Sequence, residues 1–216
     1  MQSFSQYHID KMVYRAEPKP KHQRRLDEHE DYDLLNCTSL DAPVIMFPPN
    51  SSIDVKCELE LIESHQIMCK DPKHLEEIYD DDFDWAFKEL CQDNNLEYDK
   101  AYFKKLMKEV ASITIRLKYK YNRPRPFQLA PIHCVDLHVE GSKTANTPSF
   151  PSGHSMQAMT QALVIAKIYP EISDKAFNLA KEISKSRIVG GHHFPSDIEY
   201  GEFLGQWIIQ HVKLPS

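Results

Sequence analysis

The segment of residues 99–121 constrains the fold of this chain more than any other. Apolar or small side chains recur along it at steps of three and four residues, as on one face of an amphipathic helix; they are Phe103, Met107, Val110, Thr114, Leu117 and Tyr121. No long alternation of apolar and polar residues, the pattern of a half-buried strand, competes with it elsewhere. The pattern therefore predicts one long helix and an all-α protein around it.

Other helices follow from local start and stop residues. One is expected to begin after "FPPNSS", within "IDVKCELELI", and a second to run from Asp71 to Leu90. Pro124 and Pro126 end the long helix, and a loop follows. Three more helices are expected at about 153–168, 172–188 and 197–212. Together these segments predict a single-domain helical bundle.

The composition narrows the class of partner. At 216 residues the chain can fill one core, and its formal net charge of −6 argues against a nucleic-acid polymer or a membrane as partner. No apolar run approaches the roughly 20 residues of a membrane span, and the first residues lack a signal-peptide stretch. Five scattered cysteines without a CxxC pair predict free thiols. We expect a cytoplasmic protein, with a homo-oligomer left open.

The two ends of the chain differ in character. Residues 1–44 are polar, mixed in charge and interrupted by prolines, which predicts an extended or wrapped arm ahead of a folded domain at residues 45–216. All six glycines lie beyond residue 140. Since glycine permits close backbone approach and unusual φ angles, we expect the tight geometry of a functional site in the last third of the chain.

Two segments carry residues that suit anion binding. In "KYKYNRPRPF", Lys118 and Arg125 lie about two helical turns apart and can point the same way, which suits an oxyanion such as phosphate. A solvated basic helix end would explain them as well. In "FPSGHS", Ser152 is a good N-cap, Gly153 admits a ligand, and His154 would stand beside an anion at the helix N-terminus. A capped helix with an incidental histidine is the alternative.

A third segment, "SRIVGGHHFPSD", adds an arginine, two histidines and an aspartate. Arg187 continues the apolar face of its helix, so it should be buried and should need a carboxylate or a bound anion as partner. Asp197 heads the buried face of the last helix. It either caps that helix or accepts a hydrogen bond from a histidine ring and fixes its tautomer. A histidine so held keeps its other ring nitrogen unprotonated, as a nucleophile requires.

The order and spacing of these segments are more specific than each segment alone. Lys-x6-Arg-Pro, then Pro-Ser-Gly-His, then Ser-Arg-x5-His-x3-Asp resemble the motifs of the type 2 phosphatidic acid phosphatase superfamily, which also contains the vanadium-dependent haloperoxidases. With "FPPNSS" included, the chain is most similar to the soluble class A bacterial non-specific acid phosphatases over about residues 45–212. The resemblance implies an acid-phosphatase-like catalytic domain of the all-α type at residues 45–216.

The resemblance also implies a role for each motif residue. His193, at the family's spacing from Arg187, would attack phosphorus and become a phosphohistidine, whereas His192 would have no direct chemical role. Asp197 would orient the His193 ring, and His154 would protonate the leaving alkoxide. The phosphate oxygens would be bound by Lys118, Arg125, Ser152, Gly153 and Arg187. The implied enzyme is a metal-independent phosphatase acting on small phosphomonoesters, with diphosphates open as substrates.

Two other functions stay open: a vanadium-dependent haloperoxidase and a non-catalytic phosphate-binding helical protein. The resemblance implies no cofactor, and vanadate is expected as an inhibitor or, in the haloperoxidase, as the cofactor. "HCVDLH" at residues 133–138 contains ligand-type side chains in no standard zinc spacing, so we expect no metal there. We expect "YDDDFD", residues 79–84, to form a solvated face rather than a metal site.

Overall fold

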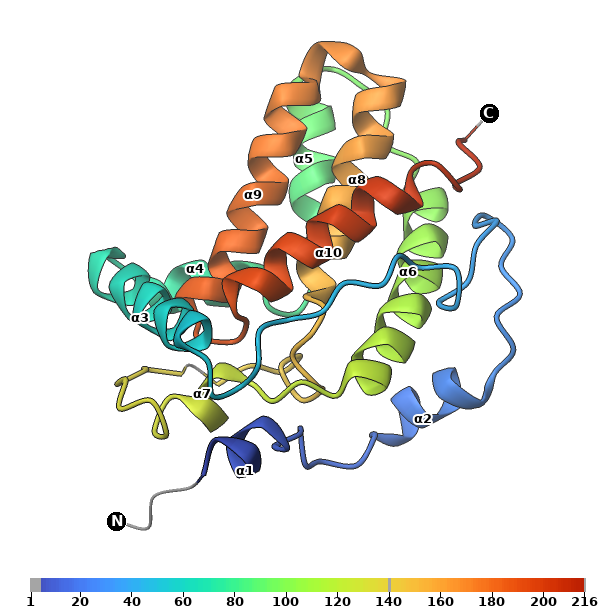
Figure 1. Cartoon of the computed structure of the whole chain (residues 1–216). Helices are drawn as coiled ribbons and strands as arrows, with labels where there is room; N and C mark the ends of the chain where they lie inside the picture. The colour runs from blue at the N-terminus through green and yellow to red at the C-terminus, as the bar shows by residue number, and fades with distance from the viewer. Residues whose placement is uncertain (1–4, 140, 216) are drawn as a thin grey trace.

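The computed structural model describes residues 5–139 and 141–215, and this part of the chain is helical without a β-strand (Figure 1). The prediction of an all-α protein is confirmed. The elements in chain order are α1 (Gln6–Asp10), α2 (Pro20–Asp27), α3 (Ile53–Met68), α4 (Pro72–Tyr79), α5 (Asp84–Asp93), α6 (Lys100–Tyr121), α7 (Pro126–Leu129), α8 (Gly153–Ile168), the 3₁₀ turn η1 (Pro170–Ile172), α9 (Ser173–Val189) and α10 (Pro195–Ile208).

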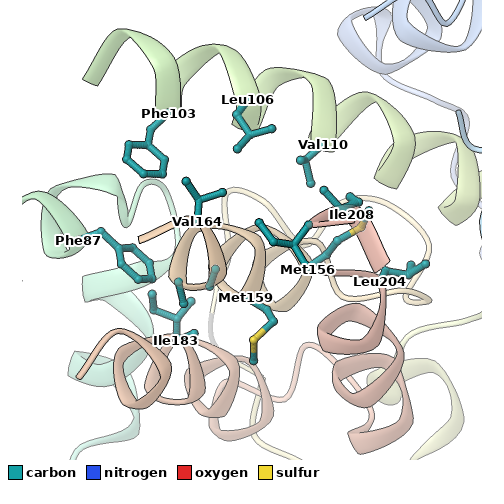
Figure 2. Close-up of a cluster of buried hydrophobic side chains, with 14 of the residues drawn as sticks. Phe87, Phe103, Leu106, Val110, Met156, Met159, Val164, Ile183, Leu204 and Ile208 are labelled. Atoms are coloured by element: carbon teal, nitrogen blue, oxygen red, sulfur yellow. The ribbon is translucent and has the colours of Figure 1, made fainter. Parts of the chain in front are cut away.

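The core lies among four of these helices. α8 packs against α9 and α10, and α6 packs on α8 from another side. Figure 2 shows the buried side chains that meet there, among them Leu106 from α6, Met156 from α8, Ile183 from α9 and Leu204 from α10. All four are fully shielded from solvent. Each such side chain stabilises the fold by roughly 1.5–3 kcal/mol relative to an exposed one.

The predicted long helix, α6, is confirmed, and it has two buried faces. Phe103, Val110 and Leu117 belong to the hydrophobic core. Met107 and Thr114, on the neighbouring face, line a cavity instead. The helix ends at Asn122, whose φ of 50° is left-handed, two residues before the first proline.

Gly201 allows α8 and α10 to pack closely, because it has no side chain. A Cβ atom there would lie 2.6 Å from the carbonyl oxygen of Ser152, well inside contact distance. Beside it, the Ser152 backbone N–H donates to the Asp197 carbonyl oxygen at 2.9 Å. Gly201 thus brings together the first turns of α8 and α10, which carry His154 and Asp197.

Two helix predictions need correction. The expected helix from Asp71 to Leu90 is two helices, α4 and α5, separated at residues 80–83. Three consecutive aspartates have low helix propensity and repel one another, and the first of them turns inward to an arginine. The last helix begins at Pro195 rather than Asp197 and ends at Ile208, because the chain then turns so that Val212 can pair with Leu35. α8 begins and ends where predicted.

The N-terminal segment, for which an extended or wrapped arm was expected, runs along the outside of the helices and includes α1 and α2 (Figure 1). The buried Glu109 carboxylate of α6 accepts hydrogen bonds from the backbone N–H groups of residues 33–35. Arg116 of α6 donates to the carbonyl oxygen of Leu26 at 3.0 Å, at the end of α2. The Tyr14 N–H donates to the carbonyl oxygen of Asn122 at 3.1 Å. The arm is therefore tied to the middle and to the C-terminal end of α6.

Two further sequence expectations concern cysteines and membranes. All five cysteines are free thiols, as predicted. Over the described residues, every helix is too short or too polar to cross a bilayer.

Candidate active site

The three motif segments converge on one cavity of about 510 Å³. Its wall contains residues from all three segments, namely Lys118, Arg125, Gly153, His154, Arg187 and His193. The two other predicted site residues, Ser152 and Asp197, are fully buried directly behind this wall. His192 is buried too but does not line the cavity. The structure therefore brings together all eight predicted site residues.

Lys118 and Arg125 are anchored by backbone carbonyl groups. The Lys118 Nζ donates to the carbonyl oxygens of Pro148 and Ser149 at 2.8 and 3.0 Å. The Arg125 guanidinium donates to the carbonyl oxygens of Thr147 and His192 at 2.8 and 2.7 Å. Burial and the charges of Arg125 and Arg187 hold the pKa of Lys118 well below its ordinary value, and burial and the Arg187 charge lower the pKa of Arg125 to about 10. A bound anion would relieve this repulsion.

Arg187 meets a carboxylate, as its position on the apolar face predicted. Its guanidinium donates to Asp80 at 2.9 Å, and the two side chains are 1% and 8% exposed. The Lys143 N–H and the Ser142 and Thr144 hydroxyl groups also donate to the Asp80 carboxylate. Burial alone would raise the pKa of Asp80, but these hydrogen bonds and the Arg187 charge lower it below the ordinary range. The expectation that the whole 79–84 segment is a solvated face is thus wrong for Asp80, because it neutralises Arg187.

His193 is held between an acceptor and a donor. Its Nδ1 lies 3.2 Å from the Asp197 carboxylate, and its Nε2 lies 3.1 Å from an Arg125 guanidinium nitrogen. A carboxylate only accepts and a guanidinium only donates, so the proton is assigned to Nδ1 and the lone pair to Nε2. Burial and the charges of Arg125 and Lys118 hold the His193 pKa well below its ordinary value. His193 therefore presents a neutral ring with its unprotonated nitrogen at the cavity.

The Asp197 carboxylate has two further partners that the sequence did not suggest. Arg123 donates to Asp197 at 2.6 Å, and the Ser149 hydroxyl donates to the same carboxylate. Burial alone would raise the Asp197 pKa, but Arg123, His193 and Ser149 lower it below its ordinary range. Arg123 is itself fully buried, with its guanidinium over the Phe194 ring. In an extended stretch residues two positions apart point to the same side, so the position of Arg123 two residues before Arg125 could have indicated a second inward arginine.

His154 enters the cavity from the first turn of α8. Ser152 caps this helix, accepting from the Ser155 N–H at 3.4 Å, as predicted. The His154 Nε2 lies 3.0 Å from the Asp80 carbonyl oxygen, and the ring packs at a tilt on Phe83. Burial and the nearby Arg187 charge hold the His154 pKa well below its ordinary value. Its ring is therefore neutral until negative charge enters the cavity.

The residues of "HCVDLH" serve the fold. The His133 ring bonds the carbonyl oxygen of Asn50 at 2.7 Å, and the Asp136 N–H donates to Glu63 at 3.3 Å. Within residues 5–139 and 141–215 no three His, Cys, Asp or Glu side chains are arranged to hold a metal ion.

The cavity has a second group of basic side chains that sequence reasoning missed. Lys21, His22 and Arg25 come from α2 in the arm, and Lys100 and Lys104 from the first turns of α6. The sequence of a polar arm with mixed charge gives no sign that its residues line a cavity. The residues of α2 reach the cavity only because the arm contacts α6.

Comparison with known proteins agrees with this geometry. The model of the PAP2 superfamily matches residues 106–213, half of the chain, and this segment contains every predicted site residue. The chain belongs to the PAP2 superfamily. Among PAP2 relatives it is 34% identical to the non-specific acid phosphatase of Providencia stuartii over 82 residues (38% of this chain, 33% of the relative).

Two other acid phosphatases show similar matches. The chain is 30% identical to the non-specific acid phosphatase of Salmonella typhimurium over 92 residues, 43% of this chain and 36% of that protein. It is 34% identical to the acid phosphatase of Zymomonas mobilis over 91 residues, 41% of this chain and 33% of that protein. The chain thus matches about a third of the length of these curated relatives. The PAP2 match begins in α6, so the arm and the first turns of α6 lie outside it.

Proposed function

We propose that residues 45–216 form an acid-phosphatase-like catalytic domain that hydrolyses small phosphomonoesters, diphosphates included, through a phosphohistidine on His193. The observation that carries this proposal is the state of the His193 ring: its Nδ1 faces Asp197, and its unprotonated Nε2 lies at the cavity wall, 3.1 Å from the Arg125 guanidinium. A phosphate-binding protein would need the cations but not an oriented nucleophile. The acid phosphatases to which the chain is similar support the same reaction class.

The first step transfers the phosphoryl group to the enzyme. The Nε2 lone pair of His193 forms the N–P bond as the bond from phosphorus to the ester oxygen breaks. The leaving alkoxide takes a proton from His154. Because His154 is neutral in the free cavity, the charge of the bound phosphate is what raises its pKa and makes it an acid. Asp197 offsets the positive charge that develops on the His193 ring.

The second step restores the enzyme. His154, now deprotonated, takes a proton from water, and the water oxygen attacks phosphorus as the N–P bond breaks. Inorganic phosphate leaves and the lone pair returns to Nε2 of His193. In both steps Lys118, Arg125 and Arg187, with the N–H group of Gly153, bind the phosphoryl oxygens, so this scheme needs no metal ion. Ser152 was expected to bind phosphate as well, but its N–H already donates to the Asp197 carbonyl oxygen, so its part is to cap α8.

The test compares variants of the two adjacent histidines with an aryl phosphate between pH 4 and 8. His193→Ala is expected to lower kcat by at least about 10³-fold, the range found for nucleophile removal, while His192→Gln serves as the matched control. Acid quench of the wild type with labelled substrate should trap an acid-labile phosphoenzyme that is absent in His193→Ala. Label that persists in His193→Ala would overturn the assignment of the nucleophile.

Two reagents test the remaining parts of the proposal. EDTA is expected to leave the rate unchanged, and strong inhibition would contradict metal independence. Vanadate, which adopts the five-coordinate geometry of phosphoryl transfer, is expected to inhibit the wild type. It should bind much more weakly when Lys118 is replaced by methionine, because that change removes one buried cation from the cavity.

A further inference from the structure

The same cavity has an outer group of cations, which we call the basic rim: Lys21 and Arg25 of α2, with Lys100 and Lys104 of α6. Lys21, Lys100 and Lys104 are exposed and Arg25 is half-buried, whereas the motif cations are almost completely buried. The basic rim therefore lies at the open side of the cavity. All four rim residues precede the segment that matches the PAP2 superfamily, so they are a feature of this chain's own arm and helix start.

The rim cations form no close ion pair among the described residues, although the Glu28 charge lies near enough to Arg25 to oppose the lowering of its pKa by burial. Within the part of the chain that the structure describes, no rim cation has a carboxylate within ion-pair distance. Three aspartates also line the cavity, but two of them are already engaged. Asp84 accepts from Tyr98 and Gln161, and Asp81 lies 3.4 Å from Lys143. The four rim cations are thus gathered at one side of the cavity without a close ion pair, in a chain of net charge −6.

His22 lies between the basic rim and the motif site. It is 6% exposed and lines the cavity, and its Nδ1 has no hydrogen-bond partner among the described residues. Burial, Lys21 and Arg25, and also Lys118 from the motif site, lower the His22 pKa to about 4. Cations of both the basic rim and the motif site are therefore close enough to His22 to lower its pKa. A buried imidazole without a partner is a group that a ligand can satisfy.

The arm is fixed firmly enough to hold these cations in place. Arg116 of α6 donates to the carbonyl oxygens of Leu26 and Glu28, one and three residues after Arg25. Its Nε also lies 3.6 Å from the Glu30 carboxylate. Between the basic rim and the motif site the cavity wall includes Phe83, Met107 and Ile115, which suits the uncharged part of a substrate.

We propose that the basic rim is a second anion subsite, which makes a phosphomonoester bearing a second phosphate group the preferred substrate class. One phosphate lies among Lys118, Arg125 and Arg187, and the other is bound by the rim cations. This inference rests on the proposed phosphatase function, which it deepens by naming the substrate class.

The test uses two matched monoesters, fructose 6-phosphate and fructose 1,6-bisphosphate. The measured quantity is the ratio of their kcat/KM values, bisphosphate over monophosphate. In the wild type it is expected to reach about ten or more. Lys21→Ala/Arg25→Ala and Lys100→Ala/Lys104→Ala should each lower it several-fold, and the quadruple variant should bring it near one, because each exposed cation contributes modestly. Raising the salt concentration should lower the wild-type ratio.

Two control variants remove a cation close to the basic rim without touching the cavity. Arg24→Ala lies beside Arg25 on α2, and Lys108→Ala lies one turn after Lys104 on α6; neither residue lines the cavity. Both should keep the wild-type ratio within about twofold. A wild-type ratio near one, or a ratio that survives in the quadruple variant, overturns the subsite.

A binding measurement separates failure of the subsite from failure of the proposed function. In His193→Ala, calorimetry should show that the bisphosphate binds about tenfold more tightly than the monophosphate, and the rim variants should abolish that preference. If the wild type shows no turnover but His193→Ala still prefers the bisphosphate, the proposed phosphatase function is refuted and the anion subsite is supported. Turnover with equal binding of both compounds would refute the subsite alone.

Discussion

Arg123→Met is the substitution that most directly tests the buried ion pair between Arg123 and Asp197, the carboxylate that holds His193. Arg123 is fully buried and donates to two carboxylates, Asp197 at 2.6 Å and Glu58 at 3.0 Å. Methionine keeps much of the side-chain volume and the apolar packing on Phe194, but it removes the charge. Asp197, whose side chain is 0% exposed, then keeps its charge with only Ser149, the Phe194 N–H and His193 as hydrogen-bond partners.

The expected loss of stability depends on which charged side chain of the Arg123–Asp197 pair remains buried without its partner. Removing one partner of a buried ion pair costs about 3–5 kcal/mol, because the other charge stays buried and uncompensated. We therefore expect Arg123→Met to lower the free energy of unfolding by about 3–4 kcal/mol. Asp197→Asn should lower it less, by about 2 kcal/mol, since Arg123 keeps Glu58 as its partner. In the double variant neither charge of this pair remains, so the total loss should stay near that of Arg123→Met alone.

The assay is a double-mutant cycle from urea unfolding at pH 7. The two single losses should exceed the loss of the double variant by about 2 kcal/mol, a coupling expected of residues in direct contact. Additive losses would refute the reasoning, because they would show that Asp197 does not depend on Arg123 for its charge compensation. Arg24→Met, an exposed arginine on α2, is the control and should change stability by less than about 0.5 kcal/mol.

Three further predictions concern packing and pH. Gly201→Ala should cost about 2–3 kcal/mol by thermal unfolding, because its Cβ would lie 2.6 Å from a carbonyl oxygen, whereas Gly141→Ala, with open space around it, should cost almost nothing. The Asp80 pKa is depressed in the fold, so the stability contributed by the Asp80–Arg187 pair is present above about pH 4 and lost as the pH falls. Asp80→Asn should therefore destabilise the protein at pH 7 by about 2 kcal/mol and flatten the fall in stability between pH 4 and 2. The NMR titration of His22, identified by its loss in His22→Gln, should have its midpoint near 4 and move upward when inorganic phosphate is bound; a midpoint at its ordinary value of about 6.5 would contradict the buried position of this ring.

The predictable part of the fold is the part encoded locally. The three-and-four repeat of α6 and the Ser152 cap of α8 depend on residues within a few positions of one another, and both are found as predicted. The inward direction of Arg187 followed from its place on an apolar helix face, and it meets the carboxylate that its burial requires. The convergence of the three motif segments followed from the family resemblance, which carries long-range information that periodicity lacks.

The parts that escaped prediction depend on contacts between distant residues. Asp80 pairs with Arg187, more than 100 positions later in the chain, and nothing near Asp80 distinguishes it from Asp81 and Asp82, which stay exposed. Arg123 is adjacent to the recognised cations, yet its partner Asp197 lies 74 positions away. The charges of the arm become part of the cavity only because Glu109 and Arg116 fix the arm to α6.

The balance of buried charge explains why the cavity is suited to an anion. Without an anion, buried cations remain without a negatively charged partner, which is energetically unfavourable. Four cations are buried around it, Lys118, Arg123, Arg125 and Arg187, against two buried carboxylates, Asp80 and Asp197, and the less buried Glu58. Arg187 pairs with Asp80, and Arg123 pairs with Asp197 and Glu58. Among the described residues, Lys118 and Arg125 donate to neutral acceptors: backbone carbonyl oxygens, the Thr147 hydroxyl and the lone pair of His193. Neutral partners do not offset the burial of these two cations or the repulsion from Arg187, and Arg125 also repels Lys118, so the pKa values of both Lys118 and Arg125 are lowered. A phosphate dianion supplies the missing two negative charges and restores full protonation of the lysine. Binding should therefore take up protons from solution at alkaline pH, and calorimetry in buffers of different ionisation enthalpy measures that uptake directly; phosphate binding without proton uptake at pH 9 would show that Lys118 is already charged in the empty cavity.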